Sequence, residues 1–279
     1  MVVDSAATLP PGLAAGVPTF TVPMSVVLDG KAYLDGVDLS PSDFYRLLKH
    51  AASPPKTSAP SPARFLDAYR QAAGIADAVL CITVSPRFSA CHDAAKLAQD
   101  EARKELSQFP IEVVDSGSAA AGEALVALAA LRAASDAKAL ADAEAAARAA
   151  VPKVRLLAYL DTLYYLWKGG RVPGIAYAGV SLLDLKPLFE MAQGEVKNLA
   201  RPRTARRAMR RLTERMRDRV GSARIRVGVM HAGAPDAAET LRRMVTEEFD
   251  CAELFVTEFS PVMGAHTGPG LLGLAFHLD

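Results

Sequence analysis

The sequence predicts an α/β fold made of two α/β domains, and three observations support this prediction. Short apolar runs alternate with segments whose apolar residues recur every three or four positions, which is typical of β-α-β units. The chain has 279 residues, about twice the usual size of one domain. The pattern changes after Val151-Pro152, where hairpin signals first appear. We therefore expect an N-terminal domain over residues 1–150 with a parallel Rossmann-like sheet, and a C-terminal domain over residues 151–279 with a mixed sheet and helices.

The first half contains apolar runs rich in β-branched residues that predict strands, at 22–28, 78–84 and 111–114. Helical spacing predicts helices at 41–50, 62–73 and 89–108. Ser40-Pro41 and Ser61-Pro62 each place an N-cap before a first-turn proline. Residues 119–150 include 18 alanines in 32 positions, interrupted by charged residues, which predicts two packed helices that meet near Ser135-Asp136.

The second half is predicted to begin with a strand at 153–159, followed by a Gly-Gly turn at 169–170. Gln193-Gly194 is the expected turn of a hairpin over 187–199. The remaining elements are expected to be helices at 204–220 and 236–247 and strands at 225–230, 252–258 and 271–277. The hairpin makes this second sheet mixed.

Composition excludes several classes of protein. Hydrophobic residues make up 51% and charged residues 23%, as in soluble globular proteins, and the net charge of +1 does not favour nucleic acid or an anionic membrane as a partner. The three cysteines form no Cys-x-x-Cys pair, so neither a disulfide framework nor a structural zinc is expected. No basic leader precedes a long apolar run, and no apolar stretch has the length of a membrane span. We expect a cytoplasmic protein; transient contact with a membrane surface stays open.

Four polar clusters lie beside predicted strand ends, where open α/β sheets build their sites. Residues 56–62 form a hydroxyl-rich loop before a helix start, which suits an anion, although Ser61 alone also serves as an N-cap. Residues 85–92 form a second anion-binding turn. Ser89 and Cys91 there suggest a nucleophile, but side chains two or three positions apart on a helix point in different directions.

The third cluster, 161–172, ends an aromatic helix in a Lys-Gly-Gly-Arg turn that holds a guanidinium outward for a carboxylate or phosphate. The fourth, 264–270, is predicted as a glycine-bounded turn between two strands, carrying His266. A lone histidine also serves a structural role in many proteins.

Together, in this order, the clusters resemble the motifs of the DegV family of bacterial fatty-acid-binding proteins over nearly the whole chain. The motifs that carry the resemblance are Asp4-Ser5 with Ala7-Thr8-Leu9-Pro10, the segment 28–36, Thr57-Ser58-Ala59-Pro60-Ser61, the turn 82–89, Val114-Asp115-Ser116, the segment 163–172, Leu182-Leu183-Asp184-Leu185-Lys186-Pro187, and the segment 264–270. Where the family turn has Ser-Gly-Thr, this chain has Ser89-Ala90-Cys91.

The resemblance implies two domains of the EDD type with one long-chain fatty acid bound between them. It implies that the carboxylate is held by Thr57, Ser58, Ser89, Ala90 and His266. Arg171 and Thr267 are then expected to face a partner kinase, which phosphorylates the bound carboxylate with ATP. No metal, no cofactor and no catalysis by this chain are implied, so the chain is expected to be a carrier or subunit in phospholipid metabolism.

Two alternatives stay open. A stand-alone hydrolase or acyltransferase would use Ser89 or Cys91 with His266 as base. An arginine-driven nucleic-acid binder would use residues 201–226, which hold eleven arginines against Glu214 and Asp218. This run equally suits phospholipid head groups, an acidic partner face or a solvated helix, and the even net charge disfavours nucleic acid.

Overall fold

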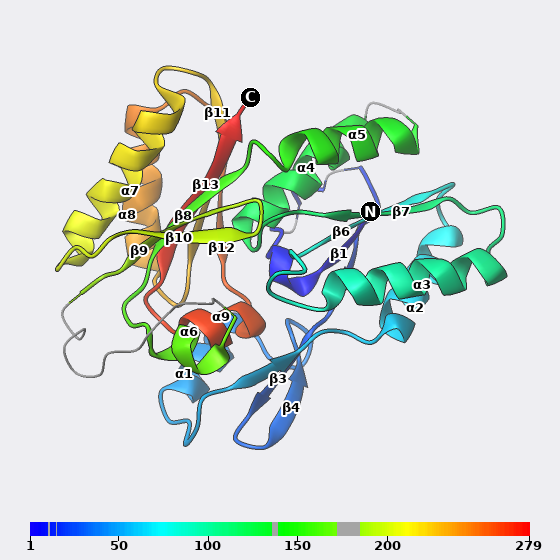
Figure 1. Ribbon diagram of the computed structural model, residues 1–279, viewed down its shortest axis with the longest axis horizontal. Coiled ribbons are helices and arrows are strands. Elements are labelled where there is room, and N and C mark those ends of the chain that lie inside the picture. Colours follow the sequence, from blue (N-terminus) through cyan, green and yellow to red (C-terminus); the bar gives the residue numbers. More distant parts are fainter. Residues whose placement is uncertain (11, 15, 136–138, 172–184) are drawn as a thin grey trace.

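The computed structural model describes residues 1–10, 12–14, 16–135, 139–171 and 185–279. Its first sheet is parallel, with strand order β2-β1-β6-β7. The strands are β1 (Val2–Asp4), β2 (Phe20–Val22), β6 (Val79–Thr83) and β7 (Ile111–Asp115). Helices α2 (Pro62–Ala73) and α3 (Cys91–Glu105) pack on one face, and α4 (Ala121–Ser135) and α5 (Leu140–Ala150) on the other (Figure 1). The predicted parallel sheet is confirmed.

The second sheet is mixed, as predicted, with order β10-β9-β8-β13-β11-β12. Only β11 (Ile225–His231) and β12 (Cys251–Glu258) pair in parallel, while β8 (Arg155–Tyr159), β9 (Leu188–Ala192), β10 (Glu195–Ala200) and β13 (Leu272–Leu278) pair with antiparallel neighbours. Helices α7 (Ala205–Val220) and α8 (Pro235–Glu248) cover the outer face. The predicted hairpin at Gln193-Gly194 is confirmed.

Helix α4 lies between the two large sheets and contacts β6, β8, β11 and β13 (Figure 1). Small alanine side chains allow a helix to approach a sheet on each side, which explains why so much of this segment is apolar all round. The predicted pair of helices is confirmed, with α4 ending at Ser135; Asp136 lies outside the described residues.

A third, small sheet has the order β4-β3-β5, with β3 (Ser25–Leu28), β4 (Lys31–Leu34) and β5 (Lys56–Ser58). The single strand predicted at 22–28 is therefore wrong: it divides at Pro23-Met24 into β2 and β3, because proline offers no N–H to a ladder and the chain changes sheets there. The predicted loop at 56–58 is also wrong, because β3 pairs with Lys56–Ser58.

Helix α9 (Pro261–Thr267) replaces the turn expected at 264–270. Ser260 caps it by accepting a hydrogen bond from the amide of Met263, and Pro261 occupies its first turn, a start signal that the sequence analysis missed here. Helices α1 (Pro41–Leu48) and α6 (Tyr164–Gly169) and the small sheet pack against α9. The strands of the first large sheet all precede residue 150, and those of the second all follow it. The small sheet belongs to the first half of the chain but packs on α9, which belongs to the second half.

Candidate functional site

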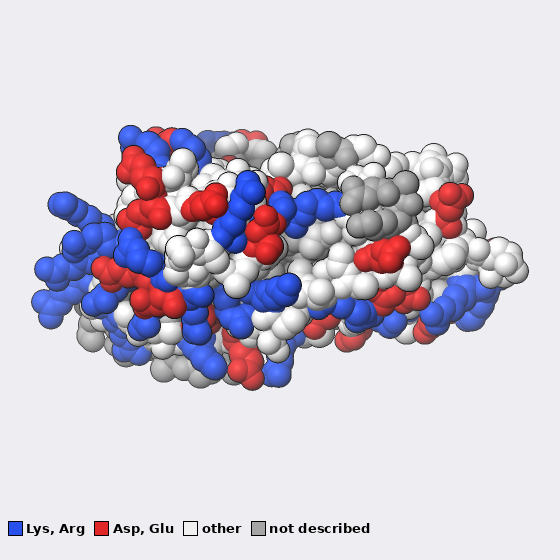
Figure 2. All heavy atoms as spheres, turned by 90° about the horizontal axis from the view of Figure 1, so that it is seen from above, with Lys and Arg blue, Asp and Glu red and all other residues white. Residues whose placement is uncertain are grey.

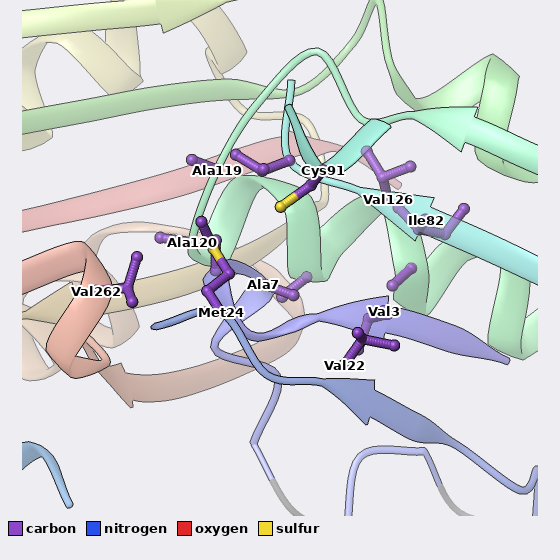
Figure 3. Packing of buried hydrophobic residues seen from close by; sticks show 14 of the residues in the cluster. Val3, Ala7, Val22, Met24, Ile82, Cys91, Ala119, Ala120, Val126 and Val262 are labelled. Atoms are coloured by element: carbon purple, nitrogen blue, oxygen red, sulfur yellow. The ribbon is translucent and has the colours of Figure 1, made fainter. Parts of the chain in front are cut away.

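A cavity of about 220 Å³ opens where the first sheet, the small sheet and helices α6 and α9 meet. Most of its wall is apolar, and the wall residues come from both halves of the chain: Ala6, Met24, Ala59, Val84, Phe88, Ala119, Leu166, Met191, Val262 and Met263. Figure 3 shows Met24, Ala119 and Val262 on three separate segments of this packed region. Such a wall desolvates a ligand without fixing its orientation by hydrogen bonds.

The polar groups of the cavity include Thr57 on β5 and His266 on α9, whose Oγ1 and Nε2 atoms are 2.7 Å apart. Burial, and secondarily the charge of Arg171, lower the pKa of His266 to about 4. The imidazole is therefore uncharged at neutral pH, and it acts as a hydrogen-bonding group rather than as a cation.

Gly169 allows His266 to take this position. A Cβ atom on Gly169 would lie 2.5 Å from Nδ1 of His266, which is shorter than real contacts, so only glycine permits α6 and α9 to approach this closely. Gly170 follows with a φ of 62° and ends the helix, so the predicted Gly-Gly turn is confirmed. The pair of glycines thus places Arg171 beside the cavity that His266 lines.

The turn before α3 forms another part of the wall, through Ser89 and Ala90. The amides of Cys91 and His92, at the start of this helix, make no hydrogen bond with any residue the structure describes. The N-terminus of a helix of 15 residues carries partial positive charge and free N–H groups. This end of the cavity therefore favours an anion.

Asp4, at the end of β1, holds the chain in place just before the turn that leads into α3. It is fully buried, and its two oxygens accept hydrogen bonds from the amides of Val84 (2.8 Å) and Ala6 (2.9 Å), both of which line the cavity. Burial raises the pKa of Asp4 to about 6, while the two amides act in the opposite direction. In the sequence Asp4 stands out only as part of a motif, and no local pattern indicates this role.

Asp35 is a second buried carboxyl group that shapes the wall. Its oxygens accept hydrogen bonds from the hydroxyls of Ser5 (2.6 Å) and Ser260 (2.8 Å) and from the amide of Val262 (3.1 Å). Ser5 in turn accepts a hydrogen bond from the amide of Met24. Asp35 therefore joins the first turn of the chain to the start of α9, a connection between distant segments that no local pattern reveals.

The nucleophile hypothesis finds no support in the geometry. The Ser89 hydroxyl donates to the sulfur of Cys91 at 3.2 Å, whereas the ring of His266 forms its hydrogen bond with Thr57. Cys91 is fully buried, and this burial raises the pKa of its thiol far above the ordinary value, so the reactive thiolate is disfavoured. Among the described residues, neither candidate nucleophile is paired with a histidine base.

The cavity brings together six of the seven predicted site residues: Thr57, Ser89, Ala90, Arg171, His266 and Thr267. Ser58 is exposed and is not among the lining residues, because successive side chains of a strand point to opposite faces. Arg171 is also exposed, and its guanidinium donates to the carbonyl of Gly169 at 2.8 Å. Of the motifs quoted above, Val172 and residues 182–184 lie outside the described residues.

Within the described ranges, no helix combines the length and the apolar character needed to cross a membrane. In the same ranges, no group of three or more histidine, cysteine, aspartate or glutamate residues is placed to hold a metal ion.

Comparison with known proteins relates this chain to a family. Residues 1–279 match the family described as "Uncharacterised protein, DegV family". A DegV domain-containing protein of Streptomyces coelicolor is 36% identical over 276 residues, which cover 98% of this chain and 96% of the relative. One from Mycobacterium tuberculosis is 31% identical over 278 residues, covering 98% and 95%.

Solved structures agree with this match. A DegV family protein from Thermus thermophilus, described as binding fatty acid, superimposes with a TM-score of 0.90 at 30% identity and covers 100% of this chain and 98% of its own. A Thermotoga maritima protein, whose structure is said to reveal fatty acid binding, has a TM-score of 0.88 at 25% identity, with the same coverage. The Streptococcus pneumoniae fatty acid kinase B3 protein loaded with linoleic acid shares the fold, with a TM-score of 0.88 at 19% identity and coverage of 100% and 98%.

Proposed function

The chain belongs to the DegV family, and we propose that it binds one long-chain fatty acid in the cavity between its two halves and acts as a carrier. The observation that carries this proposal is the cavity itself, in which an extended apolar wall meets Thr57, His266 and the start of α3. An amphiphile with one small anionic head is the ligand that such a distribution fits. The fatty acids bound by the Thermus and Thermotoga relatives support the same ligand class.

The tail would supply most of the affinity. Each methylene moved from water into an apolar cavity contributes about 0.8 kcal/mol, so a dozen contribute on the order of 10 kcal/mol before the entropic costs of binding. The head group needs only a few donors, and the hydroxyl of Thr57 and the free amides of α3 provide them. Ser89 contributes its hydroxyl after turning away from Cys91.

The Thr57–His266 pair orients one of these donors. Nδ1 of His266 is buried and has no hydrogen-bond partner among the described residues. We assign the ring proton to Nε2, because this tautomer leaves a lone pair rather than an N–H group unsatisfied at Nδ1. Nε2 then donates to the oxygen of Thr57, and the threonine keeps its own hydrogen for the ligand carboxylate.

The carrier role assigns the chemistry to a partner. Under this proposal a kinase supplies ATP in the cytoplasm and phosphorylates the bound carboxylate. Arg171 faces that partner, because it is exposed at the wall of the cavity, with a guanidinium suited to a phosphate. Thr267 also lines the cavity, but it is buried and its hydroxyl donates to the carbonyl of Met263 at 3.1 Å, so the expectation that it faces the partner is not carried further. We further propose that residues 1–150 and 151–279 are the two domains between which the acid lies.

Native mass spectrometry of the protein purified without added lipid tests the ligand. The expected result is one fatty acid per chain, released on denaturation and identified by its mass. A protein that is empty and also fails to take up oleate or palmitate in equilibrium dialysis would contradict the proposal. When a fatty acid is bound, its measured acyl length reports how much of the cavity wall the tail contacts.

Thr57→Val tests the head-group site, because valine keeps the shape and removes the hydroxyl. We expect affinity for oleate to fall about 10- to 100-fold, since a hydrogen bond to a charged group contributes roughly 1.5–3 kcal/mol. Displacement of a fluorescent fatty acid measures the change. Ser58→Ala is the matched control, being the adjacent hydroxyl on the exposed face of β5, and it should bind as the native chain does. Equal losses in both variants would place the carboxylate elsewhere.

A further inference from the structure

A second hollow, of about 530 Å³, lies at the start of α7 and shares no described lining residue with the fatty-acid cavity. We call it the arginine hollow. The described residues that line it are Ala200, Arg201, Pro202, Arg203, Arg207, Arg210, Arg211 and Glu214. In Figure 2, basic side chains project together at the end of the molecule that carries α7. The proposed fatty-acid function makes no use of this feature.

The walls of the arginine hollow come from two elements. Arg207, Arg210, Arg211 and Glu214 follow the spacing of one face of a helix, so they form a stripe along α7. Arg201 and Arg203 belong to the segment that connects β10 to α7, and they form the other side. Guanidinium groups from a helix and from a loop thus border one space.

The charges of the arginine hollow are poorly compensated. Among the described residues, no carboxylate forms an ion pair with Arg201, Arg203, Arg207 or Arg210; Arg211 alone of the lining arginines pairs, with Glu214 at 3.1 Å. The opposite end of α7 differs, since Arg217 pairs with Glu248 and Arg219 with Glu190. Ion pairing with carboxylates therefore decreases toward the start of α7, where the hollow lies.

The position of these charges on the helix is unfavourable in the absence of an anion. The first turn of α7 contains Arg206 and Arg207 and no acidic residue, although the N-terminal end of a helix favours negative charge. Like charges three and four positions apart, such as Arg207, Arg210 and Arg211, also repel one another. A bound anion would relieve both effects.

We propose that the arginine hollow binds a soluble oligophosphate, an anion that carries two or more phosphate groups. The planar guanidinium matches phosphate oxygens with two parallel hydrogen bonds, and four uncompensated charges exceed what one phosphate neutralises. The lining residues include no aromatic side chain on which a nucleic-acid base would stack. The site is concave with charged rather than apolar walls, which suits a compact solute better than a membrane surface.

Titration calorimetry with inorganic tripolyphosphate at low ionic strength tests this site. We expect one ion bound per chain and a rise in the melting temperature, because the ion binds only the folded state. Arg207→Gln/Arg210→Gln should weaken binding at least about tenfold. The matched control is Arg215→Gln/Arg217→Gln, which removes the same charge from α7 at positions outside the hollow and beyond the first turn, and should change affinity less than twofold.

Other outcomes would overturn the proposal. Equal weakening in the two double variants would show a diffuse field rather than a site. Absence of tripolyphosphate binding, or preferential binding of single-stranded DNA or of phosphatidic acid vesicles that tripolyphosphate does not displace, would assign the arginines to another partner. Fatty-acid occupancy, measured in the same samples, should be unchanged in every variant, so failure here is distinguishable from failure of the carrier proposal.

Discussion

Asp35→Ala is expected to destabilise the fold by about 3 kcal/mol or more and to abolish tight fatty-acid binding. The substitution leaves the hydroxyls of Ser5 and Ser260 and the amide of Val262 without their acceptor, and each unsatisfied buried group costs about 1–3 kcal/mol. Binding should fail as well, because Met24 and Val262, at the two ends of this network, line the cavity. Urea unfolding and equilibrium dialysis with oleate measure the two effects.

Asp38→Ala is the matched control for Asp35→Ala. Asp38 lies three positions away and is exposed, and its carboxylate accepts one hydrogen bond, from the amide of Leu34 at 2.8 Å. We expect a loss below about 1 kcal/mol and unchanged binding. If Asp35→Ala retained both the stability and the oleate affinity of the native chain, the carboxyl group of Asp35 would not organise the cavity wall.

Glu123→Leu should have a large effect in the opposite direction, a gain in stability of about 2 kcal/mol or more at pH 8. Glu123 is fully buried in α4, and neither carboxyl oxygen has a hydrogen-bond partner among the described residues. Burial, and then the charges of Asp4 and Asp115, raise its pKa well above the ordinary value. Leucine removes the unsatisfied group and suits a helix that contacts apolar strands on both sides.

The pH dependence of this gain identifies its cause. A carboxyl group whose pKa is raised on folding stabilises the fold below its unfolded pKa, and this contribution is lost as the pH rises toward the folded value. The advantage of Glu123→Leu should therefore grow from about pH 4.5 upward. Asp4 titrates with the same sign and is present in both proteins, so the difference between two urea series reports Glu123 together with its coupling to Asp4 and Asp115. A gain that did not depend on pH would mean that packing alone causes it.

Local patterns in the sequence determined most of the secondary structure. Serine followed by proline marked the starts of α1 and α2. Strands β6 and β7 were located where the helical spacing of apolar residues, every three or four positions, gives way to runs rich in β-branched residues. The order of motifs also indicated the family, and with it Thr57, Ser89, Ala90, Arg171, His266 and Thr267 as neighbours, although they span more than 200 positions. These signals lie within a few consecutive residues, where propensity and periodicity act.

Only the tertiary structure decided which of these residues face the same space. Thr57 and Ser58 are adjacent and chemically alike, yet only Thr57 lines the cavity, because the pairing of Val26 with Thr57 sets the register of β5. The hydrogen-bond partners of Asp35 are the hydroxyls of Ser5 and Ser260. Glu123 lacks hydrogen-bond partners among the described residues because the two large sheets pack against α4 from both sides. Such contacts join positions 30 to more than 200 residues apart, and no local pattern records them, since they depend on how complete elements pack.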